Sequence, residues 1–128
     1  MAGVLRLQHT SIPMPLDGRE KARRFFGEAL GMSEVTPPST LDVDRLVWFK
    51  AGDDGHEVHL FVDEEVSRRS GAQHLCLEVD DVLAYRERMS QQGVDVEETQ
   101  PIHNRPRFFV HDPFGNLIEI TQITGEYQ

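Results

Sequence analysis

One order of predicted elements occurs twice along the chain, and this repeat limits the possible folds more than any other feature. The first copy combines period-2 and period-3.6 apolar patterns, which predict a strand at 4–12, a helix at 17–30 and strands at 32–37, 45–51 and 56–62. The second copy predicts a strand at 73–79, a helix after Asp80 or Asp81, and strands at 94–100, 107–111 and 117–123. Both copies therefore have the order β-α-β-β-β.

The spacing of landmark residues supports this internal repeat. The three matched pairs have nearly the same separation: His9 and His74 by 65 residues, Gly31 and Gly93 by 62, and His59 and Glu119 by 60. Small strand-helix units seldom stand alone, so the two copies are expected to share a core or pair their sheets. The 128 residues fit one domain, with module one at about 4–63, module two at about 72–123, and a polar connector at 63–71.

The last two strands of the second copy predict a β-hairpin. They flank residues 112–116 (DPFGN), in which proline presets φ and glycine or asparagine accepts positive φ. On the outgoing strand, Ile118 and Ile120 share one face, so Glu119 lies on the other. Glu119 is therefore a carboxylate on the second face of an otherwise apolar strand.

The same alternation places two imidazoles on the second faces of other strands. His59 lies opposite the apolar side chains of Val58 and Leu60, and His74 lies opposite those of Leu75 and Leu77. A first-strand imidazole, His9, is at the position that corresponds to His74 in the repeat. If a pseudo-twofold relates the modules, His9 matches His74 and His59 matches Glu119.

These four side chains are candidate metal ligands. Three imidazoles and one carboxylate suit a first-row divalent ion, and an octahedral ion would keep two positions for water or a chelating substrate. Taken singly, each residue has an ordinary alternative: a histidine on a half-buried strand is more often a hydrogen-bonded polar residue, and Glu119 could be solvated or paired with a cation. The matched parity and spacing favour the joint site.

Other residues are candidates for substrate contact. Arg105 and Arg107 precede the hairpin and could grip an anionic substrate, although an exposed pair that offsets an acidic surface explains them as well. Trp48 and Phe61 could line a pocket, and sheet packing is the alternative. Cys76 shares a face with His74, and a buried unreactive thiol is the expected state.

Charge and length exclude several classes of partner. A net charge of −9 argues against a nucleic-acid backbone or an anionic membrane, because both would repel the chain. No apolar run approaches the ~20 residues that span a bilayer, and the N-terminus lacks a signal-peptide pattern. A single cysteine excludes an intrachain disulfide. We therefore expect a cytoplasmic protein whose partner is a small molecule.

Five segments give the chain a resemblance to the vicinal oxygen chelate superfamily, the group of glyoxalases, bleomycin resistance proteins and extradiol dioxygenases. The segments are 7–10 (LQHT), the helix from 22 to 32, 58–61 (VHLF), 74–81 (HLCLEVDD) and 112–120 (DPFGNLIEI). The resemblance covers residues 4–123. It is specific for the fold and a poor guide to the reaction.

The resemblance implies an α+β fold in which two tandem βαβββ modules form a cupped, incomplete mixed β-barrel with helices outside, usually as a homodimer. It also implies one divalent metal ion, Fe, Ni, Zn, Mn or Co, at His9, His59, His74 and Glu119. The position of His59 departs from two branches, because glyoxalase I typically has Glu there and epimerases have Gln. Fosfomycin-modifying enzymes and extradiol dioxygenases use the set that His9, His74 and Glu119 match.

The resulting functional hypothesis is a metal-dependent enzyme with isomerase, lyase or dioxygenase chemistry on a small oxygenated substrate that chelates the ion. Glu119 would then serve both as a ligand and as the catalytic group that moves a proton. The alternative is a metal-independent binding protein of the bleomycin-resistance type, and a third possibility is an accessory domain with a vestigial site. The substrate is expected to be chosen by rim loops at 37–45, 63–71 and 100–107.

Overall fold

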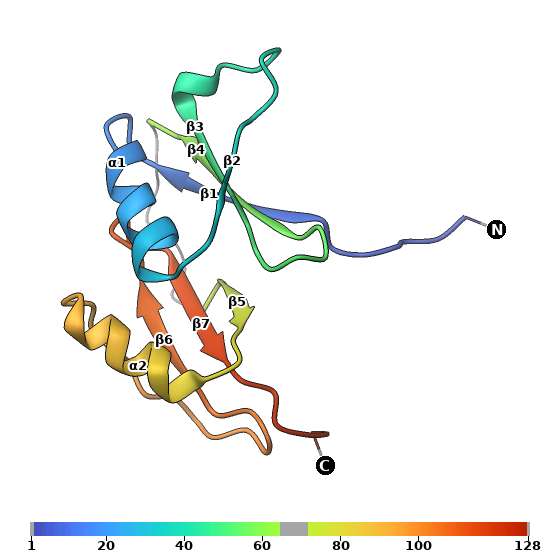
Figure 1. Ribbon diagram of the computed structural model, residues 1–128, viewed down its shortest axis with the longest axis vertical. Helices are drawn as coiled ribbons and strands as arrows, with labels where there is room; N and C mark the ends of the chain where they lie inside the picture. Colours follow the sequence, from blue (N-terminus) through green and yellow to red (C-terminus); the bar gives the residue numbers. More distant parts are fainter. Residues whose placement is uncertain (1, 65–71, 128) are drawn as a thin grey trace. The chain divides into compact units, whose positions relative to one another are not determined.

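A computed structural model describes residues 2–64 and 72–127 of the chain. The chain divides into two compact units, Met1–Val66 and Ser67–Gln128. Each unit has its own sheet and its own helical segment (Figure 1). Residues 65–71, most of the expected connector and rim loop at 63–71, lie outside the described residues.

The first unit is a four-stranded sheet with one helical segment. Its strands are β1 (His9–Met14), β2 (Glu34–Val35), β3 (Leu46–Lys50) and β4 (Glu57–Val62), in the sheet order β1-β4-β3-β2. The helix α1 (Arg19–Ala22) continues as a π-helical stretch, η1 (Arg23–Ala29), and a 3₁₀ turn, η2 (Val43–Arg45), precedes β3. Strands β1 and β4 run parallel, and the other neighbours are antiparallel.

The second unit repeats this topology. Its strands β5 (His74–Glu78), β6 (Arg107–His111) and β7 (Leu117–Thr121) have the order β5-β7-β6, with β5 and β7 parallel, and its helix is α2 (Val82–Gln91). The strand predicted at 94–100 is reduced to one bridge, between Glu97 and Phe109. The predicted α+β class is confirmed: the first unit has the βαβββ order, the second has it with the Glu97 bridge in place of one strand, and the described strands form two open sheets.

The core of the first unit lies between its helical segment and one face of its sheet. Both α1 and η1 contact β3. The rings of Phe26 and Phe49 lie 5.6 Å apart between these layers, and Phe25 packs edge-on against Phe26. The helical segment buries residues at i, i+3 and i+4 spacing, which are Ala22, Phe25, Phe26, Ala29 and Leu30.

The core of the second unit is smaller. Met89 and Val82 of α2 are buried, and α2 contacts β7. Ile118 and Ile120 are buried as their parity predicted. Val82 and Met89 are seven residues apart and therefore share one helix face, whereas Leu83 is 72% exposed.

Predicted boundaries in the first unit were wrong at several places, most of all at the start of the first strand. The first strand was expected at 4–12 and runs from His9 to Met14. It includes Pro13, which is tolerated because β1 lies at the end of its sheet. The helix was expected to begin after Asp17, yet a turn in which the Gly18 amide donates to the Pro15 carbonyl makes Gly18 the residue before the helix.

The predicted hairpin is confirmed, and Asp112 closes it. The Oδ1 atom of Asp112 accepts from the amides of Phe114 and Asn116, and its Oδ2 accepts from the Asn116 side-chain amide at 2.7 Å. Gly115 has a φ of 87°, which glycine adopts without strain. Asp112 and Asn116 are both buried, so the turn is held by polar groups that have left water.

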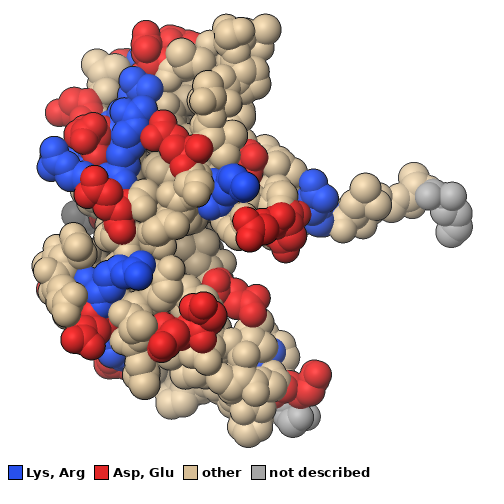
Figure 2. Space-filling model, viewed as in Figure 1, with Lys and Arg blue, Asp and Glu red and all other residues tan. Residues whose placement is uncertain are grey.

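The surface agrees with the acidic composition. Acidic side chains are spread over the face in view, with basic side chains between them (Figure 2). Within the described ranges, no helix has the length and apolar character needed to cross a bilayer.

Candidate metal and substrate site

In the first unit, His59 lies at the centre of the sheet. Its strand β4 runs between β1 and β3, where Ser11 and Trp48 are the residues opposite His59. His9 enters β1 opposite Glu57, two residues before His59. Since side chains two residues apart on a strand share a face, the register gathers His9, Trp48 and His59 on one face of the sheet.

The three rings form a stack. The ring centroids of Trp48 and His59 are 3.7 Å apart with an interplanar angle of 2°, and those of His9 and His59 are 4.1 Å apart at 16°. His59 is buried by its two neighbours, although it lies on the second face of β4. The stack fixes the plane of the imidazole.

Each imidazole of the stack is also held by a neighbouring side chain. His59 Nε2 lies 2.7 Å from Glu57 Oε1, and His9 Nδ1 lies 2.7 Å from Gln8 Oε1. Burial lowers the pKa of His59, and the contact with Glu57 only partly opposes this shift. An imidazole that is fixed at one nitrogen can present the other to a cation.

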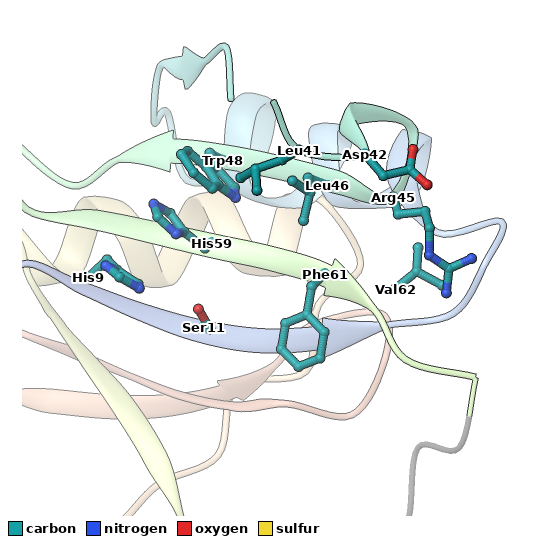
Figure 3. A pocket seen from close by; sticks show the side chains of 10 residues that line it. All are labelled: His9, Ser11, Leu41, Asp42, Arg45, Leu46, Trp48, His59, Phe61 and Val62. Carbon is teal, nitrogen blue, oxygen red and sulfur yellow. The ribbon is translucent and has the colours of Figure 1, made fainter. Parts of the chain in front are cut away.

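A pocket of about 570 Å³ opens beside this stack. Figure 3 shows His9, Trp48 and His59 toward one end and Asp42, Arg45 and Val62 toward the other. The lining is mainly apolar and aromatic with a few polar groups: His9, Ser11, Leu41, Asp42, Arg45, Leu46, Trp48, His59, Phe61 and Val62. The predicted substrate residues Trp48 and Phe61 therefore both line one pocket.

Sequence reasoning missed Asp42 and Arg45 as pocket residues. Both belong to the segment that the sequence marked only as a rim loop, at 37–45. Arg45 pairs with Glu64 at 3.5 Å. The only signal was the position of this loop before a strand, and no motif singled out either side chain.

In the second unit, Glu119 occupies the place that His59 has in the first. Its strand β7 is central, with Cys76 of β5 and Phe109 of β6 opposite Glu119. His74 Nε2 lies 3.0 Å from Glu119 Oε1. The edge of the His74 ring packs against Phe109, with centroids 4.9 Å apart.

The two nitrogens of His74 both face acceptors. Nδ1 lies 2.8 Å from the carbonyl oxygen of Ala72, and a carbonyl can only accept, so Nδ1 carries a proton. Nε2 faces the Glu119 carboxylate, so this contact requires a second proton or a cation. A histidine that ligates a metal through one nitrogen usually donates its other N–H to a backbone carbonyl or a carboxylate, and the contact of Nδ1 with the Ala72 carbonyl matches that second contact.

Glu119 is stabilised as a carboxylate. Its burial opposes ionisation, but hydrogen bonds from Thr121, His74 and Arg107 outweigh this effect and lower the pKa of Glu119. The Thr121 hydroxyl donates to Oε2 at 2.6 Å, and Arg107 Nη1 lies 3.2 Å from the same oxygen. Glu119 is therefore charged at neutral pH in spite of its burial.

The two arginines predicted to bind substrate have different surroundings. Arg107 pairs with Glu119 and donates to the Gln100 carbonyl at 2.8 Å. Arg105 lies over the ring of Tyr127 at 4.1 Å and donates to backbone carbonyls of residues 104 and 125. Arg105 thus ties the 100–107 loop to the C-terminal segment.

The expected burial of Cys76 was wrong. The residue is exposed, since β5 lies at the end of its sheet. Its thiol donates to the Thr121 hydroxyl at 3.5 Å, and partial desolvation raises the pKa of Cys76.

The four predicted metal ligands occur as two pairs, His9 with His59 in the first unit and His74 with Glu119 in the second. Among the described residues, no group of three or more His, Cys, Asp or Glu side chains lies close enough to hold a metal ion. His74 and Glu119 would supply one imidazole nitrogen and one carboxylate oxygen to such an ion, and these two atoms lie 3.0 Å apart. The four-ligand site stays a prediction.

Comparison with known proteins identifies relatives over nearly the full length. The family model of the Glyoxalase/Bleomycin resistance protein/Dioxygenase superfamily matches residues 6–120. An ethylmalonyl-CoA/methylmalonyl-CoA epimerase from Cereibacter sphaeroides is 28% identical, over 92% of this chain and 98% of its own.

Solved structures agree with this match. A glyoxalase family protein from Bacillus anthracis has a TM-score of 0.85 and 28% identity, covering 96% of this chain and 98% of its own. A lactoylglutathione lyase from Agrobacterium tumefaciens has a TM-score of 0.68 and 23% identity, covering 91% and 92% of the two chains, and it shows the shared fold.

Proposed function

Since the chain belongs to the glyoxalase/bleomycin resistance protein/dioxygenase superfamily, we propose that it is a metal-dependent enzyme of the isomerase or lyase type acting on a small oxygenated substrate. The observation that carries this proposal is the surroundings of His74. Its Nδ1 donates to a backbone carbonyl and its Nε2 faces the buried carboxylate of Glu119 at 3.0 Å. A divalent cation would replace the proton that this contact otherwise needs.

The proposed ligands are His9, His59, His74 and Glu119. Three imidazoles and a carboxylate suit Fe, Ni, Zn, Mn or Co. When bound, such an ion supplies a Lewis acid that polarises a substrate carbonyl and makes the neighbouring C–H more acidic. Glu119 was also predicted to move the substrate proton; the hydrogen bonds that lower its pKa favour the ligand role.

The pocket of the first unit is the proposed substrate site. Trp48 and Phe61 give it aromatic walls, and Ser11 and Arg45 add polar groups. A short acyl group with neighbouring oxygens matches this mixture of apolar surface and few polar contacts. The relative that acts on ethylmalonyl-CoA and methylmalonyl-CoA makes a branched acyl thioester the first substrate to assay.

The direct test is exchange of the substrate hydrogen with solvent. Methylmalonyl-CoA incubated with metal-loaded protein in D₂O is expected to gain deuterium beside the thioester carbonyl, as followed by NMR. Chelator treatment and the variant His74→Ala are each expected to slow this exchange at least ~100-fold, because the polarising ion contributes several kcal/mol to the barrier. The matched control is His56→Ala, which removes a histidine that pairs with Asp54 outside the predicted rim loops.

Exchange that is equally fast after chelation would contradict metal dependence. Absence of exchange with acyl thioesters, in protein shown to hold metal, would exclude this substrate class and leave the other isomerase, lyase and dioxygenase reactions of the family.

A binding protein is the second candidate, because the residues that line the pocket, with the aromatic rings of Trp48 and Phe61 among them, all belong to the first unit. Trp48 is the single tryptophan of the chain and lines this pocket, so its fluorescence reports occupancy directly. If a ligand quenches Trp48 fluorescence with the same midpoint concentration before and after chelation, this result would favour sequestration over metal-dependent catalysis.

We also propose that the protein is a homodimer. Val4, Leu5 and Leu7 are 76–96% exposed in the segment before β1. Apolar side chains that are close together and this exposed favour association with another protein surface. Sedimentation equilibrium should give a mass near twice 14.6 kDa. A concentration-independent mass of one chain would contradict the dimer.

A further inference from the structure

The two units have the same register, so each residue around His59 has a counterpart around Glu119. Each central residue has one neighbour two positions further along its own strand, which is Phe61 beside His59 and Thr121 beside Glu119. The residue across from that neighbour on the antiparallel strand is Leu46 in the first unit and Arg107 in the second.

These counterparts differ in one chemical respect. Phe61 and Leu46 have no side-chain donor, whereas Thr121 and Arg107 both donate. The two donors thus occur in the unit whose central residue is a carboxylate. Where the central residue is an imidazole, apolar side chains take both places.

Both donors bind the same oxygen of Glu119. The Thr121 hydroxyl lies 2.6 Å from Oε2 and Arg107 Nη1 lies 3.2 Å from it, while Oε1 faces His74 Nε2 at 3.0 Å. Thr121 is buried and the Arg107 side chain is 13% exposed, so water competes little with either contact. Arg107 is itself held, because its Nη2 donates to the Gln100 carbonyl at 2.8 Å.

We propose that Thr121 and Arg107 are positioning residues that hold Oε2 of Glu119, so that Glu119 offers a divalent cation Oε1 alone. This inference rests on the proposed metal-dependent function. Because Oε2 already accepts from both Thr121 and Arg107, binding a cation through both oxygens would displace at least one of these donors and leave it, largely shielded from water, without this acceptor. One-point binding also leaves more of the coordination sphere for a chelating substrate.

The test is a titration of metal-free protein with Co²⁺, whose visible absorption reports coordination number and geometry. Thr121→Val keeps the shape of the side chain and removes the donor, and Thr121→Ser keeps the donor. Wild type is expected to bind one Co²⁺. Thr121→Val should bind it about 10- to 100-fold more weakly, as expected for removal of a partner that orients a ligand, with an altered spectrum. Thr121→Ser should restore the spectrum and most of the affinity.

Two further variants complete the design. Thr124→Val removes an exposed hydroxyl that contacts Asn104 and should leave affinity and spectrum unchanged. Arg107→Lys keeps the charge but loses the two-point geometry, so a smaller loss of affinity in the same direction is expected. Arg107→Lys decides the question if Thr121→Val fails to fold, as judged by circular dichroism without metal.

The outcomes separate the two proposals. A wild-type protein that takes up no Co²⁺ overturns the metal-dependent function and the positioning role with it. A wild type that binds Co²⁺ while Thr121→Val, or Arg107→Lys in its place, has the same affinity and spectrum overturns the positioning role alone. A loss of thermal stability with an unchanged spectrum would likewise show a purely structural role.

Discussion

At the scale of single residues, His59 and Glu119 occupy corresponding positions on the central strands of the two sheets. The side chains around each of them favour a different charge state. His59 is enclosed by the rings of Trp48 and His9, and burial lowers the pKa of its imidazole. Glu119 is equally buried, but donors from three strands lower the pKa of its carboxyl. One environment favours a neutral base and the other an anion.

The lowered pKa of His59 predicts a specific pH dependence of stability. Protonation of His59 is harder in the folded than in the unfolded chain, so its contribution to stability is present above the ordinary pKa of 6.5. This contribution is lost as the pH falls through the lower folded value. Urea unfolding of metal-free protein should therefore show a fall in unfolding free energy below about pH 6.5 that is smaller in His59→Gln.

The matched control for this measurement is His103→Ala, which removes an exposed imidazole. It should keep the wild-type pH dependence. Identical slopes for wild type and His59→Gln would show that His59 is not the group responsible.

At the scale of elements, local patterns were predictable and strand partners were not. Strand β6 was predicted to the residue, and the hairpin after it follows from residues 112–116. The alternation of Leu5, Leu7 and His9 resembles a strand throughout, yet pairing begins only at His9, opposite Glu57. Whether a segment pairs depends on a partner distant in the sequence, which its own alternation does not contain.

The Asp112 turn leads to a prediction about the stability of the hairpin. Asp112→Ala removes the acceptor for three donors, of which the Asn116 groups are buried. The free energy of unfolding should fall by about 2–4 kcal/mol, because buried donors are left without partners. Chemical denaturation measures this change. The exposed turn variant Asp53→Ala should stay within about 0.5 kcal/mol of wild type, and an equally small effect of Asp112→Ala would contradict the account.

At the scale of the whole molecule, the repeat was the most informative feature of the sequence. The same topology and register recur in both units, with Ser11 opposite His59 and Cys76 opposite Glu119. Sequence spacing alone pointed to His9, His59, His74 and Glu119. It did not reveal Thr121 or the role of Arg107 beside Glu119, since a hydrogen bond across strands depends on register, which single residues do not encode.

The central claim is that these four side chains bind one divalent ion, and metal content tests it most directly. Protein purified without added metal or chelator should contain about one transition-metal ion per chain by elemental analysis. His9→Ala and His74→Ala should each lose most of it while keeping the wild-type circular dichroism spectrum, and His103→Ala should retain it. Equal metal content in all four proteins would contradict the assignment of these ligands, and no metal in wild type even after reconstitution would contradict the metal-dependent function.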